Sequence, residues 1–418
     1  MRPVPRGKPG KGIMLSAKGG LRLSMEVKGF SAAAVEAGIR YQDRLDLGLI
    51  YSDRPAVTAG VFTTNRVKAA PVLLDQERLK QGQAQAILVN SGNANACTGE
   101  QGMEFARLTA EMAANRLKID PAQVLVASTG VIGEPLDAQP FADAMPELVA
   151  SLSRDGFSDL ARAMMTTDTR PKIATRTIAI DGTVVSLLGV AKGAGMIMPN
   201  MATMLSFVIT DAQIVFPVLR DIVRCGVEKT FNRITVDGDT STNDTVLVMA
   251  NGAAGNGWLD EDNPVAVETF SQAVREIFGE LATMIVEDGE GATKLVTIRV
   301  EGAREQKQAL DAARTIANSP LVKTAFFGED PNWGRIIAAL GRSGCTFHQD
   351  RVSISFDDVL MVENGQARGG TAEQEAAKVM RKKRFTVVVQ LHDGTESGEI
   401  MTCDLSDKYI AINADYRS

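Results

Sequence analysis

The sequence predicts a layered α/β protein with mixed sheets. Helical and strand patterns alternate along the whole chain, with no internal repeat and no low-complexity linker. Antiparallel hairpin signals occur beside this alternation, which favours a mixed-sheet sandwich over one doubly wound parallel sheet. The chain has 418 residues, 44% of them hydrophobic, so it can bury a substantial core and form two or three domains.

In the first half of the chain, short apolar runs predict strands and a 3.6-residue period predicts a helix. The strands cover residues 45–51, 86–90 and 124–127, and the helix covers residues 103–117. Two further strand patterns, at 173–180 and 183–190, are separated by Asp181-Gly182, a strong signal for a two-residue hairpin turn. This hairpin leads the chain directly to Lys192.

The second half continues the alternation. Strands are predicted at 204–209, 245–249 and 352–356, helices at 216–231, 264–286, 333–340 and 372–380, and a hairpin of 386–391 with 398–403. The long helix begins with Pro264 in its first turn and ends in Gly-rich sequence near residue 290. We therefore expect a main domain over residues 1–290 and a smaller C-terminal α/β domain over residues 291–418.

Composition and charge argue against several classes of protein. The net charge is −6 without a basic stripe, and 5% of the residues are aromatic, so nucleic acid is not an expected partner. The basic N-terminal residues precede no apolar core, so we expect no secretory signal and a cytoplasmic location. The four cysteines have no paired spacing, which predicts neither a disulfide framework nor a metal site.

The segment from Lys192 to Asp211 is the most unusual in the chain. Its 18 uncharged residues are long enough to suggest a membrane span, but glycines, Pro199 and Asn200 interrupt the run, so we expect no membrane segment. What remains is a turn that leads into the strand at 204–209, with Thr203 at its start. Thr203 is either an ordinary β-branched strand residue or a nucleophile.

If Thr203 is a nucleophile, its proton acceptor is not expected to be a histidine. The two histidines, His348 and His392, stand beside no nucleophile motif. An α-amino group is the natural substitute, because its unperturbed pKa is about 7.7 to 8.0. Such a group exists at Thr203 only if the chain is cut before this residue.

The chain resembles the ornithine acetyltransferases of arginine biosynthesis, also called bifunctional glutamate N-acetyltransferases. The resemblance rests on eight ordered segments, NSGNANACTG (90–99), STGVIG (128–133), TTDT (166–169), KGAGMIMPNMATML (192–205), TVDGDTSTND (235–244), EDGEGATK (287–294), EDPNWGR (329–335) and INADYRS (412–418). Together they span nearly the whole chain. The resemblance implies that the precursor cuts its own Ala202-Thr203 bond, giving fragments 1–202 and 203–418 that assemble as two of each.

The resemblance also implies an activity. The enzyme would move an acetyl group from N-acetylornithine to glutamate through an acetyl ester on Thr203, giving ornithine and N-acetylglutamate, because covalent catalysis replaces one hard step by two easier ones. It implies no cofactor. Some members of the family also use acetyl-coenzyme A as a substrate, and no local feature of this sequence decides whether this chain does.

The resemblance assigns residues to the site. It places oxyanion donors at Thr129 and Gly130. Losing one such donor typically raises the barrier by roughly 3 to 4 kcal/mol. The substrate site is implied to be lined by Thr169, Lys192, Thr203, Glu290, Asn413 and Ser418, with Ser418 on a C-terminal tail that returns to the active site. N-acetylornithine carries a carboxylate and a distal ammonium, which Lys192 and Glu290 match in charge.

Each assignment has a structural alternative. Thr129-Gly130 could build only a tight turn, Lys192 and Glu290 could be surface charges, and Asn413 and Ser418 could belong to a frayed tail. Arg170 departs from the apolar or aromatic residue expected after TTDT, which leaves substrate preference open. We assign EDPNWGR a structural role.

Two other functions share these features. A self-processed amidohydrolase or aminopeptidase would use the same Thr203 with water as the acyl acceptor. A non-catalytic metabolite-binding protein would use the Gly-rich turns only to bring its backbone close to a ligand, and its chain would stay intact.

Overall fold

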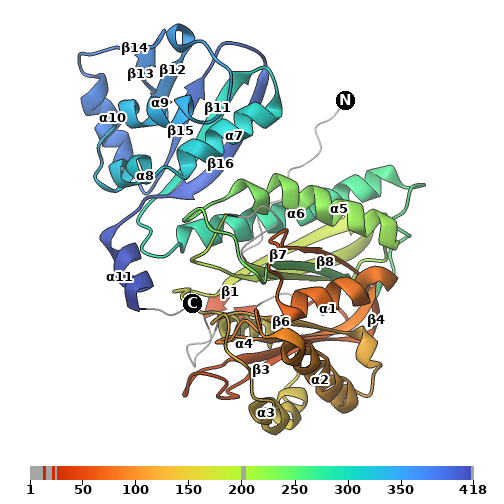
Figure 1. The fold of residues 1–418 in the computed structure, drawn as a ribbon. Helices are drawn as coiled ribbons and strands as arrows, with labels where there is room; N and C mark the ends of the chain where they lie inside the picture. The colour runs from red at the N-terminus through yellow and green to blue at the C-terminus, as the bar shows by residue number, and fades with distance from the viewer. Residues whose placement is uncertain (1–12, 16–20, 24–25, 199–203, 416–418) are drawn as a thin grey trace.

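The computed structural model describes residues 13–15, 21–23, 26–198 and 204–415. Ala202, Thr203 and Ser418 therefore lie outside the described residues. Two short strands near the N-terminus, β1 (Ile13–Leu15) and β2 (Leu21–Leu23), pair with each other. The other strands form two larger sheets, each with its own helices (Figure 1).

The first sheet has eight strands and is mixed. Its order is β6-β5-β4-β10-β9-β8-β7, with β3 also paired to β4, and only the pairs β5-β6 and β9-β10 are parallel. The strands are β3 (Phe30–Val35), β4 (Leu47–Phe62), β5 (Gln83–Asn90), β6 (Val124–Ser128), β7 (Lys172–Ile180), β8 (Thr183–Lys192), β9 (Leu205–Thr210) and β10 (Thr245–Ala250). The predicted hairpin of β7 and β8 is confirmed, and Asp181 and Gly182 both have positive φ, as a type I′ turn requires.

The long strand β4 bends the first sheet. Its pairing with β5 shifts register between Tyr51 and Ala56, where residues 53–55 are exposed. The first half of β4 pairs with β3 and the second half with β10. The two halves of the sheet share one buried apolar cluster, which includes Ile87 of β5, Leu188 of β8 and Phe207 of β9. The halves therefore form the two inner layers of a sandwich.

Helices cover the outer faces of this sandwich. Helices α5 (Phe216–Lys229) and α6 (Pro264–Glu287) pack on the β7–β10 half, while α1 (Ala70–Arg78), α2 (Gly99–Leu117) and α3 (Gln139–Ala150) pack on the other half (Figure 1). The shorter α4 (Phe157–Ala163) contributes Phe157 and Leu160 to the cluster between the halves. The order of layers is thus helix, sheet, sheet, helix.

The second sheet has six strands in the order β14-β13-β12-β15-β11-β16. They are β11 (Leu295–Ala303), β12 (Ser353–Phe356), β13 (Val359–Glu363), β14 (Gln366–Ala367), β15 (Arg384–Gln390) and β16 (Glu396–Cys403). Its helices are α7 (Gln306–Ala317), α8 (Pro320–Phe327), α9 (Trp333–Gly341) and α10 (Ala372–Met380). The buried core of this part draws only on residues 296–400. We keep the domain border near residue 290 as a prediction.

One predicted pairing is wrong. Strands β15 and β16 were expected to form a hairpin, but β11 lies between them, parallel to β15 and antiparallel to β16. The connecting loop crosses over the end of β11, where Leu391 and Asp393 donate backbone hydrogen bonds to Glu301 and Gly302. A Cβ on Gly394 would lie 2.2 Å from the Ala303 carbonyl oxygen, so a glycine permits this close crossing. Strand patterns identify strands, but they do not identify neighbours.

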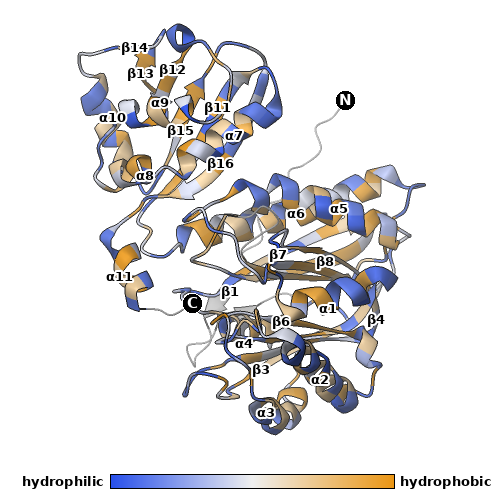
Figure 2. Cartoon of the chain, viewed as in Figure 1, coloured by the Kyte–Doolittle hydropathy of each residue, from blue (hydrophilic) through white to orange (hydrophobic). Residues whose placement is uncertain are grey.

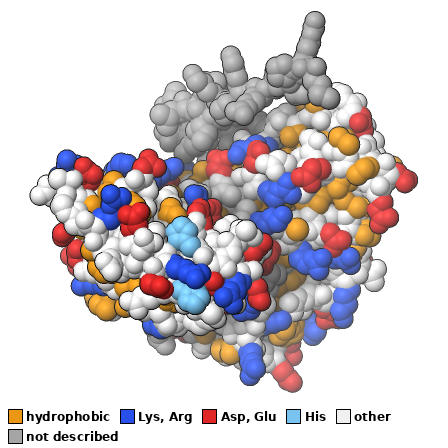
Figure 3. Space-filling view, turned by 90° about the horizontal axis from the view of Figure 1, so that it is seen from above, with side chains coloured by type: hydrophobic (Ala, Val, Ile, Leu, Met, Phe, Trp, Pro, Cys, Tyr) orange, Lys and Arg blue, Asp and Glu red, His pale blue; other side chains and the backbone are white. Residues whose placement is uncertain are grey.

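Surface properties agree with the composition. Hydrophobic colour is concentrated on the strands, while helices such as α7 carry both colours (Figure 2). On the face shown in Figure 3, cationic and anionic side chains are interspersed, without a continuous basic stripe. Within the described part of the chain, no helix has the length and apolar character needed to cross a membrane.

Asp75 of α1 is an acid buried between this helix and the first sheet. Its Oδ1 accepts a hydrogen bond of 2.9 Å from the Val126 backbone N–H, and its Oδ2 has no partner among the described residues. Burial raises the pKa of Asp75 well above its ordinary value. The folded chain therefore binds this proton more tightly than the unfolded chain, whose Asp pKa is about 3.9, and the free energy of unfolding falls as pH rises above that value.

We expect Asp75→Asn to reduce this pH dependence. Asparagine keeps an acceptor for Val126 and does not ionise, so the loss of unfolding free energy between about pH 5 and pH 8 should shrink by about 1 to 3 kcal/mol. Urea denaturation at both pH values measures the change. The control is Asp159→Asn, at an acid whose side chain is 55% exposed and which should change little. An identical pH dependence in wild type and Asp75→Asn would contradict the prediction.

Candidate active site

A cavity lies where β6 and β8 end and β9 begins. Loops from distant parts of the sequence complete its wall. The lining residues include Thr129, Gly130, Thr166, Thr167, Lys192, Gly195, Met196, Met204, Asn243, Asp244, Glu290 and Asn413. Seven of the eight segments singled out in the sequence contribute to this wall or lie directly behind it; EDPNWGR does not line it.

Most of the described predicted site residues line this cavity. Thr129, Gly130, Lys192, Glu290 and Asn413 do so. Thr169 does not, because its hydroxyl and backbone N–H both donate to Asp288 in the wall behind. Ala202, Thr203 and Ser418 lie outside the described residues. Met204, the residue after Thr203, lines the cavity.

The predicted oxyanion turn follows β6 directly. Gly130 has a φ of +133°, and a Cβ there would lie 2.3 Å from the Gly92 carbonyl carbon, so the turn requires a glycine. Thr129 donates its backbone N–H to Asn90. The turn is therefore structurally demanding, and it also faces the cavity, so the structural and functional interpretations of STG are compatible.

Asn243 was not singled out from the sequence, although it lies in a quoted segment. Its side-chain amide donates to the carbonyl oxygens of Ala94 at 2.5 Å and Ser128 at 2.8 Å. This one buried amide ties the NSGNANACTG and STGVIG segments to the loop before β10. Only the spatial convergence of these loops reveals this role.

Lys192 and Glu290 are buried charges, not surface charges. Each is 8% exposed, and both face the cavity. Burial lowers the pKa of Lys192. Glu290 is held from two sides, since its backbone N–H donates to the Ala194 carbonyl and its carboxylate accepts a 2.7 Å hydrogen bond from Asn413. Lys192 and Glu290 thus present a cation and an anion to a ligand in this cavity.

The C-terminal helix α11 (Asp407–Asp415) brings Asn413 to this site. Tyr409 lies 3.4 Å from the Asp237 carboxylate, and Ser406 donates to the Gly291 carbonyl at 2.6 Å. Asp237 in turn accepts from the backbone N–H groups of Met196 and Ile197. The described part of the C-terminus is therefore docked on the TVDGDTSTND and EDGEG loops and is not a frayed tail.

Backbone strain occurs near the expected cut. Met196 has a φ of +57°, a region that costs a non-glycine residue of order 1 kcal/mol or more. The two hydrogen bonds that the Met196 and Ile197 backbone N–H groups donate to Asp237 hold this turn. Pro199 lies outside the described residues.

Besides Glu290, the site contains a second buried acid, Asp244, which was not singled out from the sequence. It is 2% exposed, and its carboxylate is hydrogen-bonded by the Met204 backbone N–H and by Ser241. Burial raises the pKa of Asp244 well above its ordinary value, which favours the neutral acid. The acid therefore touches the backbone immediately after Thr203.

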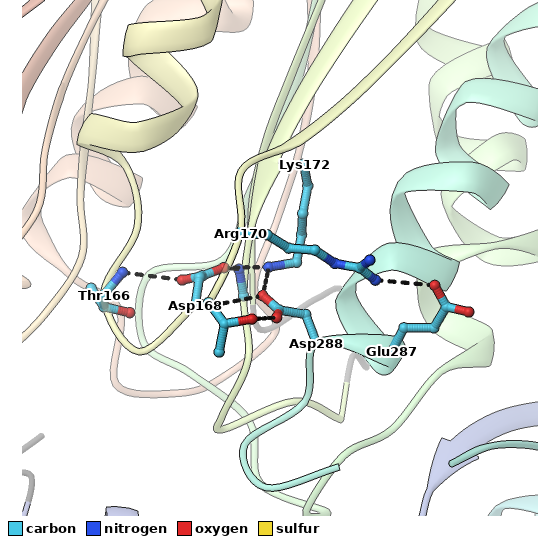
Figure 4. Close-up of polar contacts among 8 residues, drawn as sticks. Thr166, Asp168, Arg170, Lys172, Glu287 and Asp288 are labelled. Carbon is cyan, nitrogen blue, oxygen red and sulfur yellow. Dashed lines mark hydrogen bonds and ion pairs between the residues drawn. The ribbon is translucent and has the colours of Figure 1, made fainter. Parts of the chain in front are cut away.

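Arg170 and EDPNWGR lie away from the cavity. The Arg170 side chain is 51% exposed and pairs with Glu287 at 3.1 Å (Figure 4). In EDPNWGR, the Asn332 side chain accepts from the Arg335 backbone N–H at the start of α9, and Trp333 packs against the second core. Among the described residues, no cluster of three or more His, Cys, Asp or Glu side chains could hold a metal.

The chain is similar to known proteins along most of its length. A family model described as the ArgJ family matches residues 31–418. The chain is 59% identical to the arginine biosynthesis bifunctional protein ArgJ of Desulfotalea psychrophila, over 94% of this chain and 100% of that protein. It is 54% identical, with the same coverage, to the protein of that name from Geobacter sulfurreducens. A crystal structure of the Bacillus halodurans protein of that name, 42% identical, covers 51% of this chain and 100% of its own, with a TM-score of 0.49.

We expect Gly195→Ala to displace Glu290. A Cβ at residue 195 would lie 2.3 Å from Glu290 Oε1 and 2.4 Å from Oε2, so the carboxylate must move. If Glu290 binds the distal ammonium of N-acetylornithine, kcat/KM for that compound should fall by about tenfold to a hundredfold. Steady-state kinetics measure the loss. Gly341→Ala, at a glycine with open space around it, is the matched control and should leave kcat/KM unchanged. Equal kinetics in the two variants would argue against this role of Glu290.

Proposed function

We propose, because the chain belongs to the ArgJ family, that it is an acetyltransferase of arginine biosynthesis. It transfers the acetyl group of N-acetylornithine to glutamate through an ester on Thr203. The observation that supports this proposal most is that two buried and opposite charges, Lys192 and Glu290, line one cavity together with Met204, the residue after Thr203. The substrate carries the complementary carboxylate and ammonium groups.

Self-cleavage prepares the nucleophile. The Thr203 hydroxyl attacks the carbonyl carbon of Ala202, the peptide C–N bond breaks, and an ester forms. Water then hydrolyses this ester, leaving a carboxylate on Ala202 and a free α-amino group on Thr203. The strained turn at Met196 lies in the same loop and can raise the energy of the uncut chain.

The transfer then proceeds in two half-reactions. The Thr203 hydroxyl attacks the acetyl carbonyl while its own α-amino group accepts the hydroxyl proton. The Thr129 hydroxyl and the Gly130 N–H stabilise the oxyanion, and collapse of the intermediate returns the proton to the leaving amine and releases ornithine. The glutamate amine attacks the acetyl ester in the same way, giving N-acetylglutamate and free Thr203.

Substrate groups are assigned by charge and reach. Lys192 pairs with the substrate carboxylate and Glu290 with the distal ammonium, with Asn413 orienting Glu290. Ser418 stays a proposed substrate-binding residue on the resemblance alone. Thr169 contributes to the site indirectly, through its two hydrogen bonds to Asp288. Acetyl-coenzyme A is a further candidate acetyl donor, and no cofactor is required for the chemistry proposed here.

The two fragments are expected to stay together after the cut. Strand β8 belongs to fragment 1–202 and β9 to fragment 203–418, and they pair over six residues, from Leu187 opposite Thr210 to Lys192 opposite Leu205. The fragments also share the large apolar cluster beneath α5 and α6. A heterotetramer of two copies of each fragment, and a cytoplasmic location, stay predictions.

We predict that Thr203→Ala abolishes self-cleavage. The variant lacks the attacking hydroxyl, so a denaturing gel should show one chain, whereas the wild type should show two fragments of similar size. Thr203→Ser, which retains a hydroxyl, is the matched control and should still be cut. Two fragments from the Thr203→Ala variant would place the cut, or its nucleophile, elsewhere.

We also predict that glutamate accelerates the release of ornithine from N-acetylornithine and receives the acetyl group. Mass spectrometry of the cleaved protein with both compounds should detect N-acetylglutamate in amounts equal to ornithine, with ping-pong kinetics. Ornithine release that is independent of glutamate, with acetate as the product, would identify an amidohydrolase instead. A chain that is intact and inactive would identify a binding protein.

A further inference from the structure

Four charged residues of alternating sign lead from Lys192 in the cavity wall to three residues behind it. Lys192, Asp168, Lys172 and Asp288 are each less than a tenth exposed. The Lys172 ammonium lies 2.7 Å from Asp168 Oδ1 and 2.5 Å from Asp288 Oδ2, so one cation joins two carboxylates (Figure 4). None of these residues except Lys192 was expected to belong to the site.

The two carboxylates also hold the loops that form the cavity. Asp168 accepts backbone hydrogen bonds from Gly193 at 2.7 Å and from Thr166 at 3.1 Å. Asp288 accepts from the backbone N–H and the hydroxyl of Thr169. Asp168 thus connects the TTDT loop with the turn that follows Lys192. Asp288 connects the same loop with the end of α6, two residues before Glu290.

The charges around Lys192 come from four places in the fold. Asp168, Glu290 and Asp244 favour its ammonium form, whereas burial and Lys172 oppose it. Asp244 is biased toward the neutral acid by its own burial, and Glu290 faces the proposed ligand ammonium. Asp168 differs from these two acids because it is held in its charged form. Burial opposes its ionisation, but Lys192 and Lys172 outweigh burial and lower its pKa to about 2, so Asp168 remains a carboxylate.

The distance between Lys192 and the surrounding carboxylates leaves its ammonium group accessible to a ligand. Among the described residues, no carboxylate oxygen lies within the 4.0 Å of a direct ion pair with Lys192. Asp168 therefore acts on Lys192 as a charge at longer range. A direct partner would occupy the donors of the ammonium, whereas a more distant carboxylate keeps the proton on without competing for the ligand.

We propose that Asp168 is a positioning residue that keeps Lys192 protonated and directed at the cavity, and that Lys172 and Asp288 hold Asp168 in place. The proposal rests on the proposed function only for the identity of the ligand carboxylate. Stability alone does not account for the network, because apolar residues of similar volume often replace a buried ion pair without loss. The network instead sets the charge at the point where an anionic substrate binds.

The test is Asp168→Asn. Asparagine keeps the shape and an acceptor for Gly193 but removes the charge, so Lys192 should lose its proton at a lower pH. We expect the alkaline limb of kcat/KM for N-acetylornithine to move down by about one to two pH units. The main effect should be a higher KM at alkaline pH, because Lys192 binds the carboxylate. A purely structural role would lower activity at every pH without moving the limb.

A second measurement needs no turnover. The rate at which a small acylating reagent modifies Lys192, followed by mass spectrometry, reports the neutral amine from about pH 7 to pH 11. Asp168→Asn should move this titration down by the same amount. The proposal would be overturned if both the Lys192 labelling titration and the alkaline limb of kcat/KM stayed at their wild-type pH in Asp168→Asn. If the labelling moves but no transfer to glutamate occurs, the proposed function fails and the role of Asp168 stands.

Two further variants complete the test. Asp288→Asn leaves Asp168 in place but removes the second partner of Lys172, so it should move the Lys192 titration down by less. If Asp168→Asn does not fold, Asp288→Asn takes its place in the test. A Lys192 titration in Asp288→Asn that stays at the wild-type pH would then overturn the proposal. Glu329→Gln breaks another ion pair to a mostly buried lysine, Lys294, at 3.0 Å. It is the matched control and should leave both readouts unchanged.

Discussion

The pairing of β8 with β9 is the constraint on which the rest of the site depends. Lys192, the last residue of β8, stands opposite Leu205, the first residue of β9. Directly opposed residues of an antiparallel pair lie about 4.5 to 5.5 Å apart at Cα. The segment between them must therefore leave the sheet and return to the same point. Met204, the residue before Leu205, accordingly lines the same cavity as Lys192.

Burial makes the charges around this point effective. In water, an isolated lysine and carboxylate would interact weakly, but here Lys192, Glu290, Asp168 and Asp244 are each less than a tenth exposed. Such groups need polar partners, and the loops supply them through backbone N–H groups such as that of Gly193, which donates to Asp168, and through the amide of Asn413, which donates to Glu290. The same contacts that satisfy these groups also fix the shape of the cavity.

Much of the architecture could be predicted because it is written in local periodicity. The β7-β8 hairpin follows from Asp181-Gly182, and α6 follows from its apolar stripe and from Pro264 in its first turn. The error at β15 and β16 has the opposite origin. Both strands were identified correctly, but β11, which begins 89 residues before β15, inserts between them. Nothing within either strand encodes that neighbour.

The sequence by itself determined the α/β class, most of the strands and helices, and the segments from which the site is built. Its ordered motifs also indicated the family and the residues Thr129, Gly130, Lys192, Glu290 and Asn413. Only the tertiary structure decided that Thr169 faces Asp288, that Asn243 joins three loops, and that Asp168, Lys172 and Asp288 form a buried network. The physical reason is range. Propensity and periodicity act over a few residues, whereas the contacts of Thr169 and Lys172 with Asp288, and of Asn243 with Ser128, join residues more than 100 positions apart.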